Sequence, residues 1–477
     1  MIKVKCAKKY GINSNLVILI SDLKQLPKDL LDKNEIAFVK KSVEQEIKSV
    51  EFNKMSYWLF IQMIDQKNDL NRTSENARKS GDKLLEVINT HKLTGISVLD
   101  YTKNEILALP FAEGMSLGNY QFLKYFKEKT KKQNVLSEIK IISNIIDPKS
   151  VEQLNILTEA NAIARTLVNE PVSYLTAEKF SEEIQQIFNE TDVKVEVLNK
   201  RKIESLKMGG LLAVNKGSID PPTFNIIEYK PENVVNQKPY VFVGKGVVYD
   251  TGGMNIKTED HMNDMKCDMA GGAAVTGAIY AIAKAKLPVY VIGLIPATDN
   301  RTDGNAYVSG DVIYMHDGTS VEVLNTDAEG RIILADALSY AKKYEPELVI
   351  DLATLTGAAQ RAIGHNGSVA MGTKSENEIK LLSESGYRVH ERIVEFPFWE
   401  EYDEEIKSSI ADIKNLGGPT AGAITAGKFL AHFTDYPYIH LDIAGTAFLN
   451  KKASYRGLGG TGVGVRLLFD FIKHKMK

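Results

Sequence analysis

Four acidic and three basic side chains with short, regular spacing are the residues of this 477-residue sequence that could do chemistry. Asp327, Glu329 and Arg331 occupy alternate positions of Asn325–Arg331, which reads NTDAEGR. If this segment is extended, alternate side chains project from one face and these three charged groups lie together. Neighbouring carboxylates repel one another unless a cation lies between them. The pattern therefore favours a divalent metal site, with an acidic surface turn closed by an ion pair as the simpler alternative.

A second charged cluster lies upstream, in and after Val241–Gly253, which reads VFVGKGVVYDTGG. Val241–Val243 predicts a buried strand, and the turn Gly244–Gly246 lets the backbone approach a ligand closely. The charged residues of this region are Lys245, Asp250, Lys257 and Asp268. Carboxylate oxygen suits magnesium, manganese and zinc alike, so ligand type does not select one metal. Two metals that share carboxylates would explain why so many acids are concentrated here.

The spacing of these residues resembles the leucyl aminopeptidase family, the two-metal exopeptidases also called cytosol aminopeptidases. Lys245, Asp250, Lys257 and Asp268 follow one another at intervals of five, seven and eleven, as in the family pattern, and NTDAEGR is intact. The resemblance covers roughly residues 150–477. Further segments that match in order are Asp351–Ala358, Asn415–Thr425, His440–Ala447 and Gly460–Leu468. Tyr249, Thr251 and Asn255 depart from the family residues, but none stands at a ligand position.

The resemblance implies a role for each charged residue. It implies one metal held by Asp250, Asp327 and Glu329, with the main-chain carbonyl of Asp327, and another held by Lys245, Asp250, Asp268 and Glu329. Zinc and manganese are the expected metals. A charged Lys257 is expected to polarise the scissile carbonyl. The resemblance further implies a bicarbonate ion on Arg331, which would accept the proton of the attacking water.

The resemblance also implies the substrate and the assembly. Peptides are the expected substrates, with the free amine bound to a metal together with Asp268. The small or apolar pocket positions expected to favour leucine, methionine and similar residues are Met265, Thr354, Gly357 and Ala447. A homohexamer of two stacked trimers is the expected assembly. A methionine or an alanine alone would more often belong to an ordinary core.

Several residues have simpler alternatives. Lys257 could be a surface lysine paired with an acid, and Arg331 could pair with Asp327 or Glu329. Cys267 beside Asp268 could be a nucleophile, but a small apolar filler is the expected role because no histidine stands near it. Gly244–Gly246 lacks the spacing of a phosphate-binding loop. Among the eight histidines, His261 and His440 lie near the motifs and are expected to form ordinary hydrogen bonds.

Two other function classes share these features. A protein that keeps the fold for binding DNA or for scaffolding would tolerate gaps in the charged set, whereas this set is complete. A two-metal phosphohydrolase would use the same carboxylates. The basic run Lys124–Lys132 is ordinarily a solvated helix face, and nucleic-acid binding stays open as an alternative partner.

Composition is that of a globular protein with a net charge of −2. The longest early apolar run, Leu16–Ile20, is too short for a secretory signal, and no segment is long enough to span a membrane. Two cysteines far apart in the sequence, Cys6 and Cys267, fit a reducing compartment. A cytoplasmic location is therefore expected.

The length and pattern predict an α/β protein of two domains. We expect a smaller α/β domain over residues 1–150, a connecting helix over 151–168 and a catalytic domain over 169–477, with a mostly parallel central sheet covered by helices. Expected strands of the catalytic domain are Asp192–Leu198, Phe224–Tyr229, Tyr240–Val243, Val289–Ile295 and Leu348–Leu352. Expected helices are Ala177–Phe188, Gly271–Ala285, Arg331–Lys343 and Ala421–Phe433. In the first domain we expect a strand in Met55–Ile64 and a helix over Asn76–Ile88.

Overall fold

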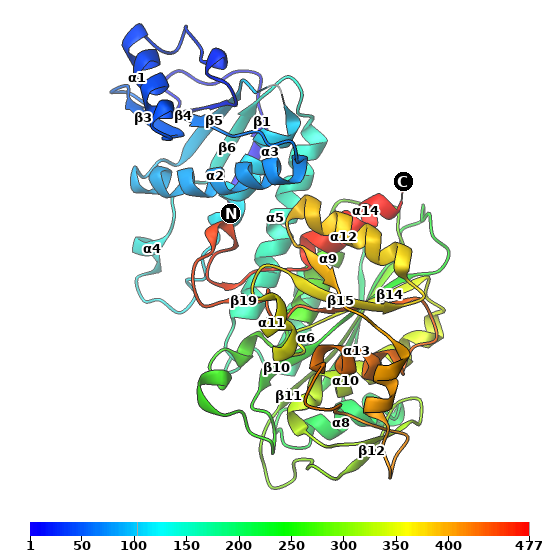
Figure 1. Ribbon diagram of the computed structural model, residues 1–477. Helices are drawn as coiled ribbons and strands as arrows, with labels where there is room; N and C mark the ends of the chain where they lie inside the picture. The colour runs from blue at the N-terminus through cyan, green and yellow to red at the C-terminus, as the bar shows by residue number, and fades with distance from the viewer. Residues whose placement is uncertain (103, 477) are drawn as a thin grey trace. The chain divides into compact units, whose positions relative to one another are not determined.

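The computed structural model describes residues 1–102 and 104–476, apart from the side chains of residues 105, 106, 259 and 261. The chain forms two compact units. Unit 1 comprises residues 1–162 with the short segment 451–457, and unit 2 comprises residues 163–450 and 458–477. The boundary falls inside helix α5 (Pro148–Asn169), the helix expected over residues 151–168. The chain is drawn from blue to red in Figure 1.

Unit 1 is built on a six-stranded sheet with the order β1-β6-β5-β2-β4-β3. All neighbouring strands are parallel except the edge pair β3 and β4. The strands are β1 (Lys3–Cys6), β2 (Leu16–Ile20), β3 (Ser49–Asn53), β4 (Trp58–Met63), β5 (Gly95–Asp100) and β6 (Glu138–Ile142). The helices are α1 (Lys33–Glu44), α2 (Leu70–Thr90), α3 (Glu105–Gly118) and α4 (Lys129–Lys132), with a 3-10 turn η1 (Leu23–Gln25).

Alternation along the central strand β2 explains why both faces of this sheet are covered. Leu16, Ile18 and Ile20 pack in a cluster with Val39 of α1. Val17 and Leu19 pack on the opposite face, among residues of α2 and α3. The strand expected in Met55–Ile64 and the helix expected over Asn76–Ile88 are present as β4 and α2.

Unit 2 contains a nine-stranded sheet with the order β16-β15-β18-β14-β9-β11-β8-β7, and β10 pairs with β11. Its centre, β18-β14-β9-β11, is parallel, whereas β15 and β8 run antiparallel to their inner neighbours. The strands are β7 (Lys194–Leu198), β8 (Thr223–Tyr229), β9 (Tyr240–Gly244), β10 (Gly246–Asp250), β11 (Val291–Asn300), β14 (Leu348–Ala353), β15 (Ser368–Thr373), β16 (Ile393–Glu395) and β18 (Tyr438–Asp442). The expected α/β fold with a mostly parallel central sheet is confirmed.

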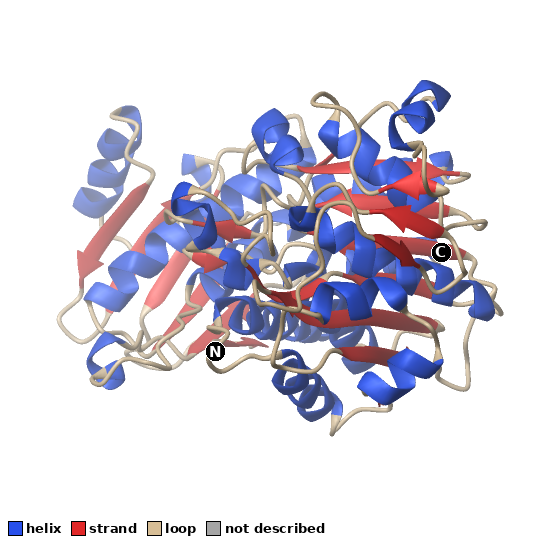
Figure 2. Cartoon of the chain, turned by 90° about the horizontal axis from the view of Figure 1, so that it is seen from below, coloured by secondary structure: helices blue, strands red, loops and turns tan. Residues whose placement is uncertain are grey.

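Helices cover both faces of this sheet, as Figures 1 and 2 show. Helices α9, α12 and α14 lie on one face, and α8, α10 and α13 on the other. The helices of unit 2 are α6 (Ala177–Phe188), α7 (Lys200–Ser205), α8 (Gly209–Asn215), α9 (Ala270–Lys284), α10 (Glu329–Ala341), α11 (Gly357–Ile363), α12 (Glu376–Val389), α13 (Gly422–Ala431) and α14 (Val465–Lys475). Two smaller sheets are formed by β12 (Val312–Tyr314), β13 (Ser320–Glu322) and β17 (Ile413–Lys414), and by β19 (Phe448–Leu449) and β20 (Gly459–Gly460).

The extended conformation considered for Asn325–Arg331 is wrong. Thr326–Ala328 form a 3-10 turn, η4, and helix α10 begins at Glu329. The Asn325 side chain accepts a hydrogen bond from the amide of Asp327 and so caps the turn. Asp327 and Glu329 are therefore brought together by a turn entering a helix, not by strand alternation.

No helix among residues 1–102 and 104–476 is long and apolar enough to cross a membrane.

Candidate functional site

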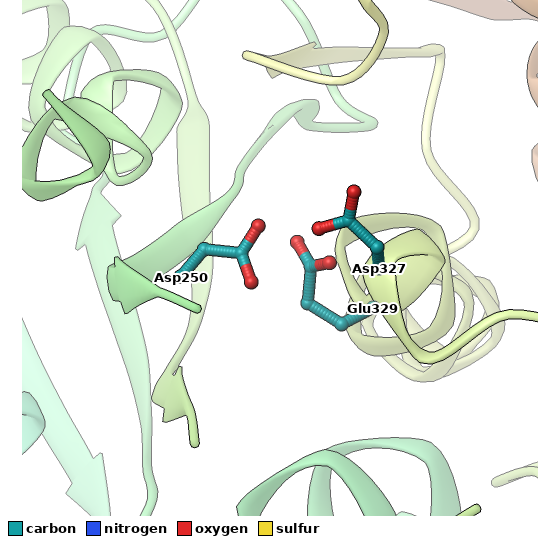
Figure 3. A group of neighbouring side chains, drawn as sticks. All are labelled: Asp250, Asp327 and Glu329. Carbon is teal, nitrogen blue, oxygen red and sulfur yellow. The ribbon is translucent and has the colours of Figure 1, made fainter. Parts of the chain in front are cut away.

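Three carboxylates converge beside the sheet of unit 2, as Figure 3 shows. Asp250 is the last residue of β10, Asp327 lies in η4, and Glu329 is the first residue of α10. Each offers one oxygen, and these oxygens lie within 4.8 Å of one another. Asp250 and Glu329 are buried, whereas the Asp327 side chain is 32% exposed. The cluster can therefore be reached from solvent on the Asp327 side.

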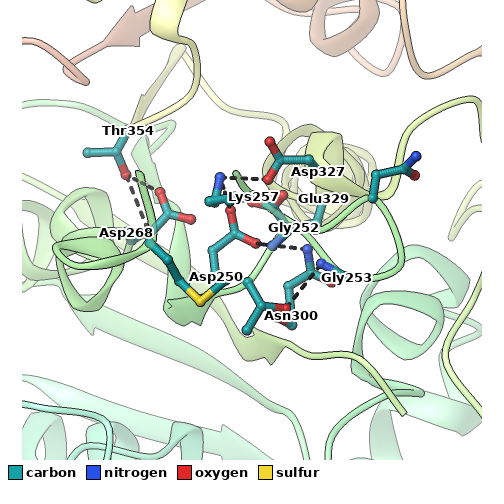
Figure 4. Close-up of polar contacts among 12 residues, drawn as sticks. Asp250, Gly252, Gly253, Lys257, Asp268, Asn300, Asp327, Glu329 and Thr354 are labelled. Atoms are coloured by element: carbon teal, nitrogen blue, oxygen red, sulfur yellow. Dashed lines mark hydrogen bonds and ion pairs between the residues drawn. The ribbon is translucent and has the colours of Figure 1, made fainter. Parts of the chain in front are cut away.

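Two lysines hold the acids together, and Figure 4 shows one of them, Lys257. Lys257 Nζ lies 2.7 Å from Asp250 Oδ2 and 2.6 Å from Asp327 Oδ1. Lys245 Nζ lies 2.7 Å from Asp268 and 2.9 Å from Glu329 Oε1, in a buried setting. All four predicted acidic ligands thus contact one of the two predicted lysines. Lys257 pairs with acids, as its simpler alternative requires, but its side chain is only 15% exposed and so is not a surface lysine.

Glycine lets the backbone approach these groups. A Cβ on Gly330 would stand 2.5 Å from Lys245 Cε, so any larger residue there would collide with the lysine. Gly252 has φ of +86°, and a Cβ on it would stand 2.4 Å from the carbonyl oxygen of Asn255. The Gly252 amide donates to Asp250 Oδ1 over 2.8 Å. Gly330 therefore leaves room for Lys245, and Gly252 orients Asp250 through its amide.

Burial and like charge disturb the titration of the acids. Burial, reinforced by the Glu329 carboxylate, raises the pKa of Asp250 and of Asp327. Burial raises the pKa of Asp268 to about 7. Burial would also raise the pKa of Glu329, but Lys245 and Lys257 outweigh it and hold that pKa below its usual range.

The lysine amines respond in the opposite sense. Burial works against the charge on Lys245 and Lys257, yet the surrounding carboxylates outweigh it and raise the pKa of both amines. Four carboxylates against two ammonium groups leave a buried excess of negative charge. Such an excess is costly unless a cation balances it.

Arg331 lies in the first turn of α10 and is buried. Its Nη1 donates to the Asn415 carbonyl over 2.9 Å, and its Nε has no hydrogen-bond partner among the described residues. No ion pair with Asp327 or Glu329 is present in the described part of the chain, so that alternative is wrong. Burial lowers the pKa of the guanidinium to about 10. A buried guanidinium with a spare donor suits an anion.

Comparisons with known proteins agree with this geometry. Residues 162–469 match the model of the cytosol aminopeptidase family, catalytic domain. The chain belongs to the cytosol aminopeptidase family. It is 45% identical over 405 residues to a probable cytosol aminopeptidase of Chloroherpeton thalassium. The aligned region covers 80% of this chain and 79% of that protein. A probable cytosol aminopeptidase of Chlorobium phaeobacteroides is 46% identical, over 77% of this chain and 75% of that protein.

A solved structure extends the similarity to nearly the whole fold. The bottromycin maturation enzyme BotP in complex with Mn has a TM-score of 0.86 and 26% sequence identity, and the match covers 98% of this chain and 100% of that one. A second solved structure of BotP has a TM-score of 0.84 and 25% identity. The resemblance drawn from the charged motifs is therefore confirmed.

The carboxylate cluster of this cytosol aminopeptidase family member fits a divalent cation. Glu329 Oε2 is buried and has no hydrogen-bond partner among the described residues, although carboxylate oxygens in a protein interior are normally paired. Glu329 is also a residue that offers a carboxylate oxygen within 4.8 Å of oxygens of Asp250 and Asp327. A hard oxygen set of this kind accepts magnesium, manganese or zinc.

Three contacts around the acids were not expected from the sequence: Asn300 was not singled out at all, Thr354 was expected only as a pocket residue, and Asn255 only as a departure from the family residue. Asn300, at the end of β11, donates from Nδ2 to Asp250 Oδ1 over 2.8 Å, and Thr354 donates to Asp268 Oδ1 over 2.7 Å. Asn255 Oδ1 accepts from the amide of Thr326 over 2.8 Å, so this departure from the family residue supports η4. The position of Asn300 and Thr354 at the carboxyl ends of buried strands could have drawn attention to them.

The predicted pocket residues differ in their burial and in their contacts with the acids. Met265 begins a 3-10 turn η3 (Met265–Cys267) that leads directly to Asp268. Thr354 contacts Asp268 itself. Gly357 begins α11 and is exposed, whereas Ala447 is buried. Their grouping into one pocket for a substrate side chain stays a prediction.

Cys267 and His440 are both buried. Burial, helped by Asp268, raises the pKa of the Cys267 thiol to about 12, which agrees with the expected role of a filler. His440 Nδ1 lies 2.8 Å from Asp351 Oδ1 in the core, in agreement with the expected hydrogen bond. The side chain of His261 lies outside the described residues.

Proposed function

We propose that this protein is a two-metal aminopeptidase that removes N-terminal residues from peptides, with a preference for leucine and similar apolar residues. The observation that carries this proposal is the convergence of Asp250, Asp327 and Glu329 with Lys257 placed against two of them. Membership of the cytosol aminopeptidase family supports the same reaction class.

We assign the metal ligands as two overlapping sets. One set is Asp250, Asp327 and Glu329 with the carbonyl of Asp327, and the other is Lys245, Asp250, Asp268 and Glu329. Zinc and manganese both suit these donors, and manganese accompanies the structural relative BotP. When bound, the metals supply a water of lowered pKa and polarise the peptide carbonyl.

The remaining side chains act on the substrate. We assign Lys257 as the donor to the oxygen that becomes negative when the carbonyl is attacked, because a buried ammonium stabilises an oxyanion strongly. We assign Arg331 as the holder of a bicarbonate ion, which its spare buried Nε suits. Asp268 would accept a hydrogen bond from the substrate amine. Met265, Thr354, Gly357 and Ala447 would line the side-chain pocket.

Hydrolysis of a chromogenic leucyl amide tests the reaction class. We expect activity that is lost after exhaustive chelation and restored by zinc or manganese. An N-acetylated leucyl peptide should be a very poor substrate, because its amine is blocked. Full activity with no metal present, or equal cleavage of blocked and free peptides, would overturn the proposal. Phosphate release without amide hydrolysis would favour a phosphohydrolase instead.

Assembly and location follow the same proposal. We propose a homohexamer, to be measured by light scattering, and a cytoplasmic location, which two free cysteines support. Nucleic-acid binding is a weaker alternative. In its support, Lys129, Lys131 and Lys132 are exposed, although Lys131 pairs with Glu128 and Lys132 lies over the Phe126 ring.

A further inference from the structure

Unit 1 has an edge where three parallel strands end side by side. Strand β2 lies between β5 and β4 and runs parallel to both. Their carboxyl ends are followed by Ser21 and Asp22, by Asp65–Lys67, and by Thr102. Polar side chains from three loops that are distant in the sequence are thus brought to one edge of the sheet.

The chain leaves these neighbouring strands toward opposite faces. After β2 it forms η1 and α1, and α1 packs on the face of Leu16, Ile18 and Ile20. After β4 and β5 it forms α2 and α3, which pack on the face of Val17 and Leu19. Adjacent strands whose connections diverge in this way define a topological switch point. In open α/β sheets the crevice at such a point is where ligands bind.

A cavity of about 690 Å³ lies at this point. Its lining residues are Ser21, Asp22, Gln25, Asp65, Gln66, Lys67 and Thr102. Every one of them is polar, whereas pockets for drug-like or aromatic ligands are mostly apolar. The lining therefore suits a small, strongly polar molecule.

The two hydroxyl groups of the cavity present acceptors. Ser21 Oγ donates to Gln25 Oε1 over 3.3 Å, and Thr102 Oγ1 donates to Asp100 Oδ1 over 2.5 Å. With their hydrogens directed to these partners, both oxygens offer a lone pair to a ligand, and Thr102 Oγ1 also accepts from the Asn104 amide over 3.2 Å. Asp22 adds a carboxylate, of which one oxygen accepts from the amide of Lys24. This part of the cavity matches a positively charged donor such as an ammonium group.

The opposite charge comes from Lys67. Its side chain is exposed and forms no ion pair among the described residues, whereas Asp65 is paired with Lys48. A phosphate group fits poorly, because carboxylates already cap the nearby helix starts. Asp22 caps η1, and Asp69 caps α2. A single lysine beside acidic residues matches a carboxylate better than a doubly charged phosphate.

We propose that this cavity binds a free α-amino acid, with its ammonium group at Asp22 and the hydroxyls of Ser21 and Thr102 and its carboxylate at Lys67. The site lies wholly within unit 1 and is independent of the metal cluster. Its existence does not require the proposed peptidase activity.

Calorimetry on the full chain with L-alanine tests the proposal, with propionate, ethylamine and ribose as matched probes. We expect saturable binding of alanine and at least tenfold weaker binding of the probes that lack one charge or both. Lys67→Gln and Asp22→Asn should each weaken alanine binding about tenfold or more, since each removes one charge-assisted contact. Asparagine also caps helical turns, so Asp22→Asn preserves η1. Lys28→Gln, an exposed lysine outside the cavity, is the control and should bind as the unchanged protein does.

Hydrogen exchange locates the bound amino acid and separates this site from the metal cluster. Slower exchange in residues 21–25 and 65–67 on addition of alanine supports the proposal. Protection confined to the segments of Asp250 and Glu329, with affinity unchanged in both cavity variants, would mean binding at the metal cluster and would overturn it. Preferential binding of ribose, or no saturable binding of alanine, would also overturn it.

Discussion

Lys245 and Glu329 form a buried ion pair, with 2.9 Å between Lys245 Nζ and Glu329 Oε1. The pair joins the end of β9 to the first residue of α10. It is possible because Gly330 has no side chain to collide with the lysine. Lys257 makes the corresponding link between Asp250 and Asp327. The two lysines thus occupy similar settings, although we assign them different roles.

Lys257→Ala should keep the metals and lose catalysis. If Lys257 stabilises charge that develops only in the transition state, its removal should lower kcat by roughly 10²- to 10³-fold, the effect of deleting one oxyanion donor. Metal content by elemental analysis and kcat on a leucyl amide are the measurements. Lys342→Ala, which removes a lysine paired with Asp317, is the control and should change neither.

Lys245→Ala should instead weaken one metal specifically, because its amine completes that metal's ligand set. Anomalous scattering at the metal edge distinguishes the two variants. If Lys257→Ala empties a position while Lys245→Ala retains both metals, the assigned roles are reversed.

Glu329→Gln should lose metal as well as turnover. The substitution keeps the shape of the side chain but removes the charge that we assign to both metals. The affinity for metal should fall by more than the roughly 10- to 100-fold that is typical of substitutions at residues that only orient the ligands. Metal titration of the chelated protein measures it, with exposed Glu347→Gln as the control. Two tightly held metals in Glu329→Gln would contradict a shared ligand.

The sequence predicts which charged residues lie together better than it predicts how the chain brings them together. Lys245, Asp250, Asp268 and Glu329 could be named because they stand in motifs of fixed spacing. Strand alternation gave the wrong conformation for Asp327 and Glu329, because a capped turn that enters a buried helix also brings residues two apart together. Secondary-structure propensity does not distinguish an extended strand from a turn that enters a helix over so short a segment.

Asn300 shows why the rest was not predictable. It contacts Asp250 because β10 and β11 pair in parallel with Asp250 opposite Asn300. Strand pairing of this kind is set by the whole sheet and leaves no local pattern. The α/β class of unit 1 could be expected from its helix and strand patterns. The position of segment 451–457 within unit 1 could not, because it depends on long-range packing.

Thr354→Val should weaken metal binding without emptying the cluster. Thr354 Oγ1 donates to Asp268 Oδ1, and valine keeps the shape while removing this donor. Affinity for one metal should fall roughly 10- to 100-fold, the usual result of losing a hydrogen bond that orients a ligand.

Thr356→Val provides the comparison, because Thr356 caps α11 and donates to Asp442 instead. It should cost about 1 kcal/mol of stability and leave metal affinity unchanged. Equal metal affinity in Thr354→Val and the unchanged protein would refute this orienting role.

The stability of metal-free protein should fall as pH rises from about 4 to about 7. Burial raises the pKa of Asp268 to about 7, and Asp250 and Asp327 shift in the same direction, whereas free carboxyls titrate near 4. Between these values the native state binds more protons than the unfolded state, so the free energy of unfolding decreases with pH. Glu329 shifts the opposite way and offsets part of this effect.

Added manganese or zinc should reverse this trend, because a bound cation replaces the protons. Thermal unfolding of chelated protein from pH 5 to 8, with and without metal, measures both effects. Metal at a hundred times its Kd adds about 2.7 kcal/mol, and this gain should shrink toward pH 5 as protons compete for the carboxylates. In Glu329→Gln the gain at pH 8 should largely vanish, whereas Glu347→Gln should retain it. A metal-induced increase in Tm that is equal at pH 5 and pH 8 would show that these buried carboxyls do not hold the cation.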